Sequence, residues 1–123
     1  MKRRIYSRLE NWKSKTRRLP LIIRGARQTG KTWLVREFGK TFLQFHEFNF
    51  QKNYELRDIF SPPKDVKKIL ELLQVFSGKK IDLKNDLIFF DEIQDCPEAL
   101  NSLKFFAEDF PESFLMAAGS LLG

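Results

Sequence analysis

The stretch of sequence that decides the fold is LIIRGARQTGKT, residues 21–32. It opens with three apolar residues, two of them β-branched isoleucines, which indicates a short strand. Its last eight residues fill every constrained position of the pattern GxxxxGK(S/T), with glycines at 25 and 30, lysine at 31 and threonine at 32. Residues 31–40 then place Leu34, Val35 and Phe38 on one face of a helix. The pattern therefore stands in the context that it requires, between a strand and a helix.

This pattern suits a loop that binds nucleotide phosphates. Backbone N–H groups would wrap around the α- and β-phosphates, and Gly25 and Gly30 would allow the close approach that a Cβ blocks. Lys31 would place its charge on the β- and γ-phosphates, while the Thr32 hydroxyl would be a ligand to Mg²⁺. The alternative is a glycine-rich turn with a solvated lysine, which pattern and context together disfavour. The expected nucleotide-binding residues are Gly25, Ala26, Arg27, Gln28, Thr29, Gly30, Lys31, Thr32 and Trp33.

Two acidic residues directly follow a second apolar stretch. Leu87-Ile88-Phe89-Phe90 is typical of a strand that is buried on both faces of a parallel sheet. Asp91 would then hold Mg²⁺ through water, and Glu92 would polarise the attacking water as a general base. Ser120, which follows the last predicted strand, would contact the γ-phosphate or orient that water. Taken alone, the acids could also end a strand in solvent, and the serine could lie in a turn of small residues.

Strands and helices alternate along the whole chain. This order predicts an α/β fold with three α-β-α layers around a mostly parallel sheet of about four strands. Residues 1–18 are expected to form a basic N-terminal helix, and residues 19–123 a P-loop ATPase core. Apolar runs predict strands at 19–23, 45–50, 87–90 and 114–118. Expected helices and their apolar faces are 1–15 (Ile5, Leu9, Trp12), 31–40, 54–60, 66–77 (Val66, Ile69, Leu70, Leu73, Phe76) and 97–110 (Leu100, Leu103, Ala107, Phe110).

The charge is distributed unevenly. Residues 1–40 hold 13 Lys and Arg against 2 acids, whereas residues 41–123 hold 9 against 14. The first eighteen residues carry eight basic residues and one acid beside Tyr6 and Trp12, a mixture found on surfaces that bind nucleic acid strands. The other interpretation is that Trp12 belongs to the buried helix stripe and that the charges are solvated.

Several classes of protein are disfavoured. Apolar runs reach about five residues, far short of the roughly 20 that a membrane-spanning helix needs. Charged residues are spread through residues 6–18, a stretch that would be apolar in a signal peptide. The cytoplasm is therefore the expected location. The single cysteine, Cys96, excludes an internal disulfide. A catalytic pair of Cys96 with His46 is conceivable, but no third orienting residue is indicated.

Several stretches together resemble the prokaryotic AAA-type ATP-binding proteins. They are PLIIR (20–24) leading into GARQTGKT, Asn49-Phe50, YELRDIF (54–60), LIFFDEIQDCPEALNSLKFF (87–106) and AAGS (117–120). In that family an N-terminal ATPase domain precedes a C-terminal domain of unknown function related to the PD-(D/E)xK nucleases. The resemblance implies an ATPase that uses Mg²⁺-ATP, with a Walker A loop at residues 25–32, the Walker B acid Asp91, and Ser120 at the sensor-one position.

The resemblance also implies roles that the residues alone do not. It makes Arg27, Gln28 and Gln94 family-pattern residues, and it places the N-terminal helix and Arg17-Arg18 near the adenine base. The family has a fifth strand beside the first, a helical lid with a second sensor, and an arginine finger, none of which occurs before Gly123. A truncated member is therefore expected, with the first strand as an open edge that invites self-association. Two functions follow: an ATP hydrolase that uses Glu92, or a nucleotide-binding switch without turnover.

Overall fold

The computed structural model describes residues 2–25 and 30–120. Four parallel strands form one sheet in the order β1-β4-β3-β2, so the fourth strand lies between the first and the third. This arrangement confirms the α/β fold with a parallel sheet. The strands are β1 (Leu21–Arg24), β2 (Phe45–Asn49), β3 (Leu87–Asp91) and β4 (Phe114–Gly119).

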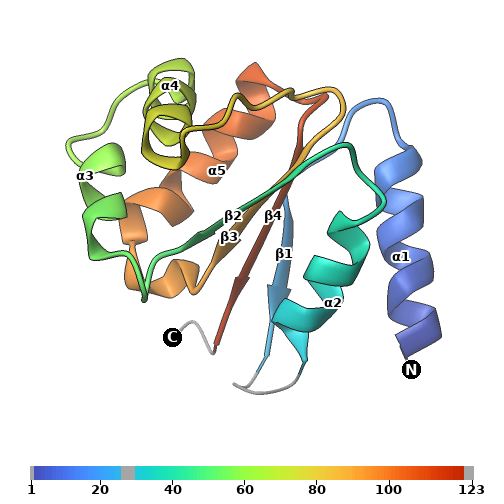
Figure 1. Cartoon of the computed structure of the whole chain (residues 1–123). Helices are drawn as coiled ribbons and strands as arrows, with labels where there is room; N and C mark the ends of the chain where they lie inside the picture. The colour runs from blue at the N-terminus through green and yellow to red at the C-terminus, as the bar shows by residue number, and fades with distance from the viewer. Residues whose placement is uncertain (1, 26–29, 121–123) are drawn as a thin grey trace.

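Helices cover both faces of the sheet and complete three layers (Figure 1). One face carries α1 (Lys2–Ser14) and α2 (Lys31–Gly39). The other carries α3 (Arg57–Phe60), α4 (Val66–Ser77) and α5 (Pro97–Asp109), together with the short 3-10 turns η1 (Tyr54–Leu56) and η2 (Ile93–Asp95).

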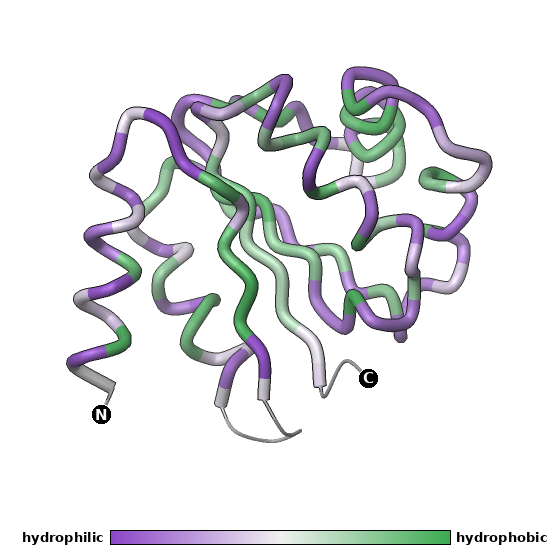
Figure 2. Tube along the Cα trace, turned by 180° about the vertical axis from the view of Figure 1, so that it is seen from behind, coloured by the Kyte–Doolittle hydropathy of each residue, from purple (hydrophilic) through white to green (hydrophobic). Residues whose placement is uncertain are grey.

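The central strand β3 supplies both hydrophobic cores, because successive side chains on a strand point to opposite faces. Leu87 and Phe89 pack in the core under α1 and α2, whereas Ile88 and Phe90 pack in the core under the other helices. Every residue of β3 is buried, as the uninterrupted apolar run predicts. Figure 2 shows the apolar residues gathered along the central strands and the inner faces of the helices.

Strand boundaries that differ from the expected ones do so by one or two residues. β1 begins at Leu21 rather than at residue 19, directly after Pro20, whose nitrogen carries no hydrogen for a strand ladder. β2 ends at Asn49, because its Oδ1 accepts hydrogen bonds from the backbone N–H groups of Gln51 and Lys52 (both 2.9 Å) and turns the chain. β1 pairs with β4 alone among the described residues, so the expected open edge at β1 is confirmed there.

Two helices turn slightly different faces to the core than the apolar spacing predicts. On α1, Leu9 and Trp12 are buried but Ile5 is 42% exposed. On α4, Phe76 is 40% exposed, although Val66, Ile69, Leu70 and Leu73 are buried as expected.

The face of α5 is also rotated. Its buried apolar residues are Ala99, Leu103 and Phe106, while Leu100 and Phe110 lie at the border of the core. Phe106 packs edge-on against Phe90, which draws this side of the helix onto the sheet. Ala107 and Phe110, which the apolar spacing assigned to the same face, are only partly buried.

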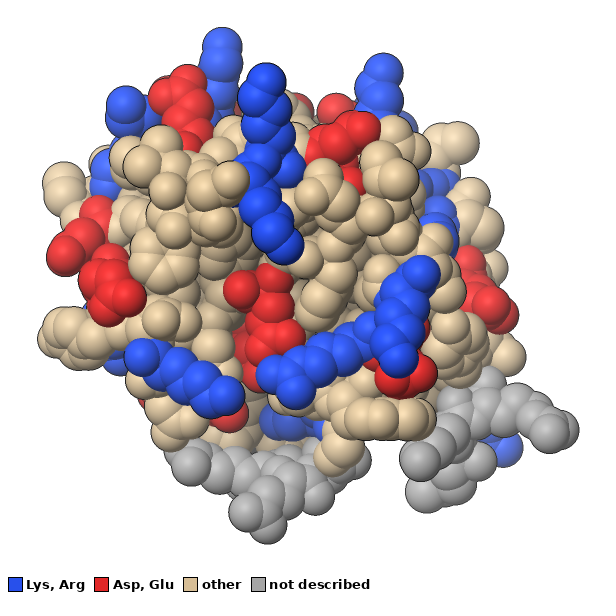
Figure 3. Space-filling view, in the orientation of Figure 1, with Lys and Arg blue, Asp and Glu red and all other residues tan. Residues whose placement is uncertain are grey.

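Trp12 and Arg18 fasten α1 to the sheet. The Trp12 indole N–H donates a 2.8 Å hydrogen bond to the carbonyl of Leu19. The Arg18 guanidinium lies 3.8 Å from the centre of the Phe114 ring and donates to the Trp12 carbonyl at 3.3 Å. Because Trp12 is buried, it is unavailable for stacking on a nucleic acid base. Basic and acidic side chains are interspersed on the face of the molecule in Figure 3, rather than gathered in one basic patch.

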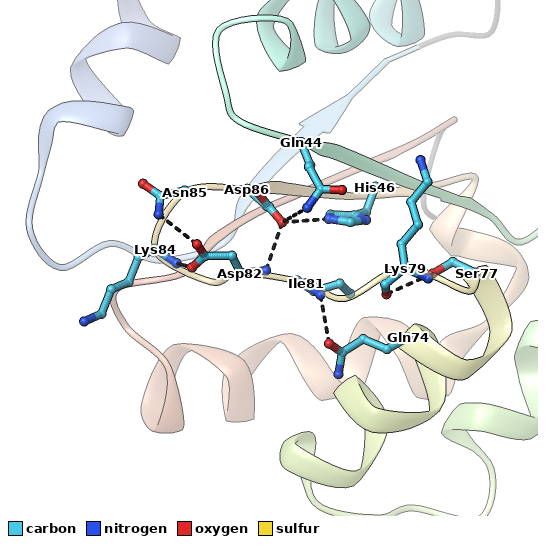
Figure 4. Close-up of polar contacts among 10 residues, drawn as sticks. All are labelled: Gln44, His46, Gln74, Ser77, Lys79, Ile81, Asp82, Lys84, Asn85 and Asp86. Atoms are coloured by element: carbon cyan, nitrogen blue, oxygen red, sulfur yellow. Dashed lines mark hydrogen bonds and ion pairs between the residues drawn. The ribbon is translucent and has the colours of Figure 1, made fainter.

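A buried polar cluster lies at the amino-terminal edge of the sheet (Figure 4). Asp86, directly before β3, is fully buried, and its Oδ2 lies 2.9 Å from Nε2 of His46 on β2. The same oxygen accepts hydrogen bonds from the backbone N–H of Asp82 at 2.9 Å and the Gln44 amide at 3.3 Å. The loop before β3 is therefore tied to β2 by one buried carboxylate, in a segment that the sequence predicts only as a polar loop.

No helix among residues 2–25 and 30–120 is long and apolar enough to cross a membrane.

Candidate functional site

The expected site residues meet at the carboxyl edge of the sheet. In a parallel sheet the carboxyl ends of all strands lie along one edge, where ligands bind in open α/β folds. Gly25 follows β1, Asp91 ends β3 and Ser120 follows β4. Lys31 and Thr32 open α2. In Figure 1 the ends of β1 and β4 and the start of α2 come together at this edge, near the label C.

Lys31 bridges the ends of two strands. Its Nζ donates hydrogen bonds to the carbonyl of Gly119 at 2.8 Å and to the carbonyl of Gly25 at 3.2 Å. Gly119 is the last residue of β4 and precedes Ser120, which is partly buried. A compact cation is thus held between the end of β1 and the end of β4 by hydrogen bonds to two carbonyls.

Gly30 shapes the start of α2. Its φ of 81° lies in the left-handed region, which a glycine adopts at no steric cost and other residues adopt rarely. The next residue, Lys31, is the first of the helix, so the backbone N–H groups of the first helical turn face the same edge. Gly25, Gly30, Lys31 and Thr32 thus lie together at the end of β1 and the start of α2.

Thr32 and Asp91 are in direct contact. The Thr32 hydroxyl donates a 3.0 Å hydrogen bond to Oδ2 of Asp91, across 59 residues of sequence. The other carboxylate oxygen accepts from the backbone N–H of Glu92 at 2.9 Å. Asp91 is only 4% exposed. Burial raises the pKa of the Asp91 carboxyl above its usual value, while the hydrogen bonds from Thr32 and Glu92 act in the opposite direction.

These two side chains suit Mg²⁺ in chemistry. A hydroxyl and a carboxylate are the hard oxygen donors that Mg²⁺ takes in proteins, usually alongside water and phosphate oxygens. A desolvated carboxylate is also stabilised by a nearby cation. The described residues hold no group of three or more His, Cys, Asp or Glu placed to bind a metal ion. Phosphate oxygens and water would have to supply the remaining ligands.

Glu92 lies beside Asp91 in an unusual backbone conformation. Its φ of 54° and ψ of 45° are left-handed, a region that few residues other than glycine occupy. The chain reverses there into η2, and Oε1 of Glu92 accepts a 2.8 Å hydrogen bond from Nε2 of Gln94. Glu92 therefore lies next to Asp91, and its carboxylate has Gln94 as a hydrogen-bond partner.

A family comparison matches most of the chain. The model of an AAA domain family matches residues 17–123. The chain belongs to this AAA domain family. Its members are AAA-type ATPases, which gives the chain a nucleotide-binding, ATPase-like function. No curated protein sequence matches the chain.

The remaining predicted residues of the AAA domain are the middle of the phosphate loop, Trp33 and Arg18. Ala26, Arg27, Gln28 and Thr29 lie outside the described residues. Trp33 lies on α2 with its side chain 52% exposed. Arg18 contacts Phe114 at the start of β4, at the amino-terminal edge of the sheet.

A cleft of about 540 Å³ runs from the phosphate-loop end of the AAA domain along α1, β1 and α2. Apolar side chains, among them Leu9, Ile23 and Leu34, line part of it, and four cationic residues line the rest. The described lining contains no acidic residue. The cleft reaches Gly30 and Lys31, so the space beside α1 is continuous with the predicted site. The cationic lining residues are Arg8, Lys15, Arg24 and Lys31.

Sequence reasoning gave no physical role to Gln94 or to the Arg36–Glu47 pair. Arg36 on α2 donates two 2.8 Å hydrogen bonds to the Glu47 carboxylate on β2, and these bonds tie α2 to the edge strand β2. The hydrogen bonds to Glu47 raise the pKa of Arg36. Gln94 shares the DEIQ stretch with the acids, and its spacing of two from Glu92 is the signal that could have indicated contact.

Proposed function

We propose that this AAA domain binds Mg²⁺-ATP at the carboxyl edge of its sheet and hydrolyses it. The observation that carries the proposal is the contact of Thr32, at the start of α2, with Asp91, at the end of β3, beside a lysine, Lys31, that bridges the ends of β1 and β4. Each is the residue type that phosphate or Mg²⁺ needs, and Thr32 and Asp91 are already in hydrogen-bond contact.

The lysine would exchange partners on binding. Its bonds to the carbonyls of Gly25 and Gly119 hold Nζ at the edge of the sheet, and the β- and γ-phosphate oxygens would replace them. A charged oxygen accepts a stronger hydrogen bond than a neutral carbonyl, which favours the exchange. The N–H groups of the first turn of α2 would add to the positive field.

Thr32 and Asp91 would hold Mg²⁺ between them and the nucleotide. When bound, this ion neutralises charge that develops on the phosphate oxygens. Glu92, next to Asp91, would accept a proton from the attacking water as the general base. Ser120, next to the carbonyl that Lys31 contacts, would donate its hydroxyl to the γ-phosphate or orient the water.

The cleft beside α1 offers a place for the nucleoside. Its apolar side chains suit a flat base, and its cations suit an anionic ligand that extends from the phosphate loop. The same charge pattern would admit other purine nucleotides, so the assignment of ATP draws on the family as well as on the cleft.

Thermal unfolding with and without Mg²⁺-ATP tests binding. Ligand at about one hundred times its dissociation constant adds roughly 2.7 kcal/mol, or about 10 °C in the midpoint of a domain of this size. Lys31→Ala should abolish the rise. Lys40→Ala is the matched control, because Lys40 directly follows the same helix and pairs with Glu37 on the surface. A rise that Lys31→Ala retains would contradict the proposed phosphate contact.

Hydrolysis requires a separate assay. Phosphate release from Mg²⁺-ATP should fall by a factor of about 10² to 10⁴ in Glu92→Gln, while the thermal shift with nucleotide persists. Equal turnover in the wild type and Glu92→Gln would refute the assignment of Glu92. A thermal shift without turnover in the wild type would replace the hydrolase by a nucleotide-binding switch.

A further inference from the structure

The turn after Asp91 brings Gln94 onto Glu92. Glu92 occupies a left-handed conformation that costs about 1–2 kcal/mol for a residue with a Cβ. Three hydrogen bonds hold the turn: Glu92 N–H to Asp91 Oδ1 at 2.9 Å, Asp95 N–H to Glu92 O at 3.1 Å, and Cys96 N–H to Ile93 O at 3.0 Å. The fold therefore stabilises a strained backbone at the residue proposed as the general base.

The orientation of the Gln94 amide is decided by its neighbour. A carboxylate only accepts hydrogen bonds, so the NH₂ group of Gln94 faces Oε1 of Glu92, at 2.8 Å. Its carbonyl oxygen, Oε1, then points away, is buried and has no hydrogen-bond partner. Rotation of the amide would set two oxygens against each other, so the observed orientation is the favourable one.

The unpaired oxygen indicates what the amide is for. Burying a polar atom without a partner costs about 1–3 kcal/mol, and a methionine of similar shape would avoid that cost. Stability alone therefore disfavours glutamine at this position. The contact that glutamine provides and methionine cannot is the N–H donor to Glu92.

We propose that Gln94 is a positioning residue for ATP hydrolysis. Its N–H holds Oε1 of Glu92 and fixes the carboxylate rotamer, so that the second oxygen of Glu92 faces the attacking water. Gln94 does not contact the nucleotide and acts through Glu92. The inference rests on the proposed function, and it assigns to Gln94 a share in the chemical step and none in nucleotide binding.

Gln94→Met is the decisive variant, because it keeps the shape of the side chain and removes the donor. We expect kcat for ATP to fall about 10- to 100-fold, since a misplaced catalytic group loses rate on this scale. KM should stay within about twofold of the wild-type value, and the thermal shift with Mg²⁺-ATP within about a degree or two. The thermal midpoint without nucleotide should be unchanged or higher, because an unpaired buried oxygen is removed.

Gln74→Met is a matched control. The Gln74 amide is bonded at both ends, to the carbonyl of Leu70 and the backbone N–H of Ile81, far along the chain from the site. This variant should lose stability and keep kcat. A general effect of glutamine replacement would lower kcat in both variants.

A double-mutant cycle separates positioning from a merely structural role. In the Glu92→Gln background, Gln94→Met should change the residual turnover less than twofold, because the carboxylate that Gln94 holds is gone. A loss of the same size in both backgrounds would overturn the inference, as would wild-type kcat in Gln94→Met. Wild-type protein that binds nucleotide but shows no turnover would instead overturn the proposed function, and this inference with it.

Discussion

Asp86 offers a sharp test of how the fold is held together. Its side chain is fully buried, and Oδ2 is the shared acceptor for His46 Nε2, the backbone N–H of Asp82 and the Gln44 amide (Figure 4). Asp86→Ala would leave the buried His46 nitrogen without this partner and would remove the acceptor of the partly buried N–H groups of Asp82 and Gln44. Each such donor costs about 1–3 kcal/mol, and removal of one member of a buried pair typically costs about 3–5 kcal/mol in total.

We therefore expect Asp86→Ala to lower the free energy of unfolding by about 3–5 kcal/mol. Since small domains have only about 5–15 kcal/mol in all, the variant should be close to unfolding at 37 °C. Urea unfolding followed by far-ultraviolet circular dichroism measures the loss. Asp86→Asn keeps one acceptor oxygen and should lose clearly less.

Lys84→Ala is the control for this loop, because Lys84 is exposed and its replacement should leave stability nearly unchanged. The cluster lies at the edge of the sheet opposite the phosphate loop. Asp86→Asn should therefore keep the full midpoint rise with Mg²⁺-ATP. A loss below about 1 kcal/mol in Asp86→Ala would refute the reasoning that this carboxylate satisfies otherwise buried donors.

Three further results are expected. Phe90→Ala should lower the free energy of unfolding, measured by urea titration, by about 3–5 kcal/mol, because Phe90 is fully buried among four other phenylalanine rings. A loss below about 1.5 kcal/mol would mean that the core collapses around the gap. Burial raises the folded-state pKa of Asp91, so this carboxyl lowers stability as the pH rises through and above its unfolded pKa. Asp91→Asn should therefore raise the metal-free thermal midpoint at pH 7, with a gain that shrinks toward pH 4, and a gain independent of pH would contradict this cause. Burial also raises the pKa of the Cys96 thiol. A thiol reagent at pH 8 should therefore react with the native protein at least about tenfold more slowly than with the urea-unfolded chain. Equal rates would show that Cys96 is open to solvent in the native state.

Local pattern predicted the strand-loop-helix unit and the acidic end of β3 because both depend on neighbours in sequence. The GxxxxGK(S/T) pattern places Lys31 and Thr32 at the start of a helix, and an unbroken apolar run places Asp91 at the end of a buried strand. Periodicity was less reliable for the buried faces of α1 and α5, where the structure leaves Ile5 exposed and turns Phe106 inward.

Contacts between distant segments could not be predicted in this way. The contacts of Arg18 are one example, because its guanidinium is held by the ring of Phe114, far along the chain, and by backbone carbonyls. The burial of Asp86 with His46 was equally hidden, since a polar loop residue gives no sign that a strand 40 residues away supplies its partner.

The sequence by itself determined the α/β order of elements and the residue types of the candidate site. Those features follow from side-chain chemistry and from spacings of a few residues. Only the tertiary structure decided that Lys31 reaches Gly119 and that Thr32 contacts Asp91. The physical reason is that a hydrogen bond forms only within about 3 Å, and the pairing of the four strands decides which distant groups come that close.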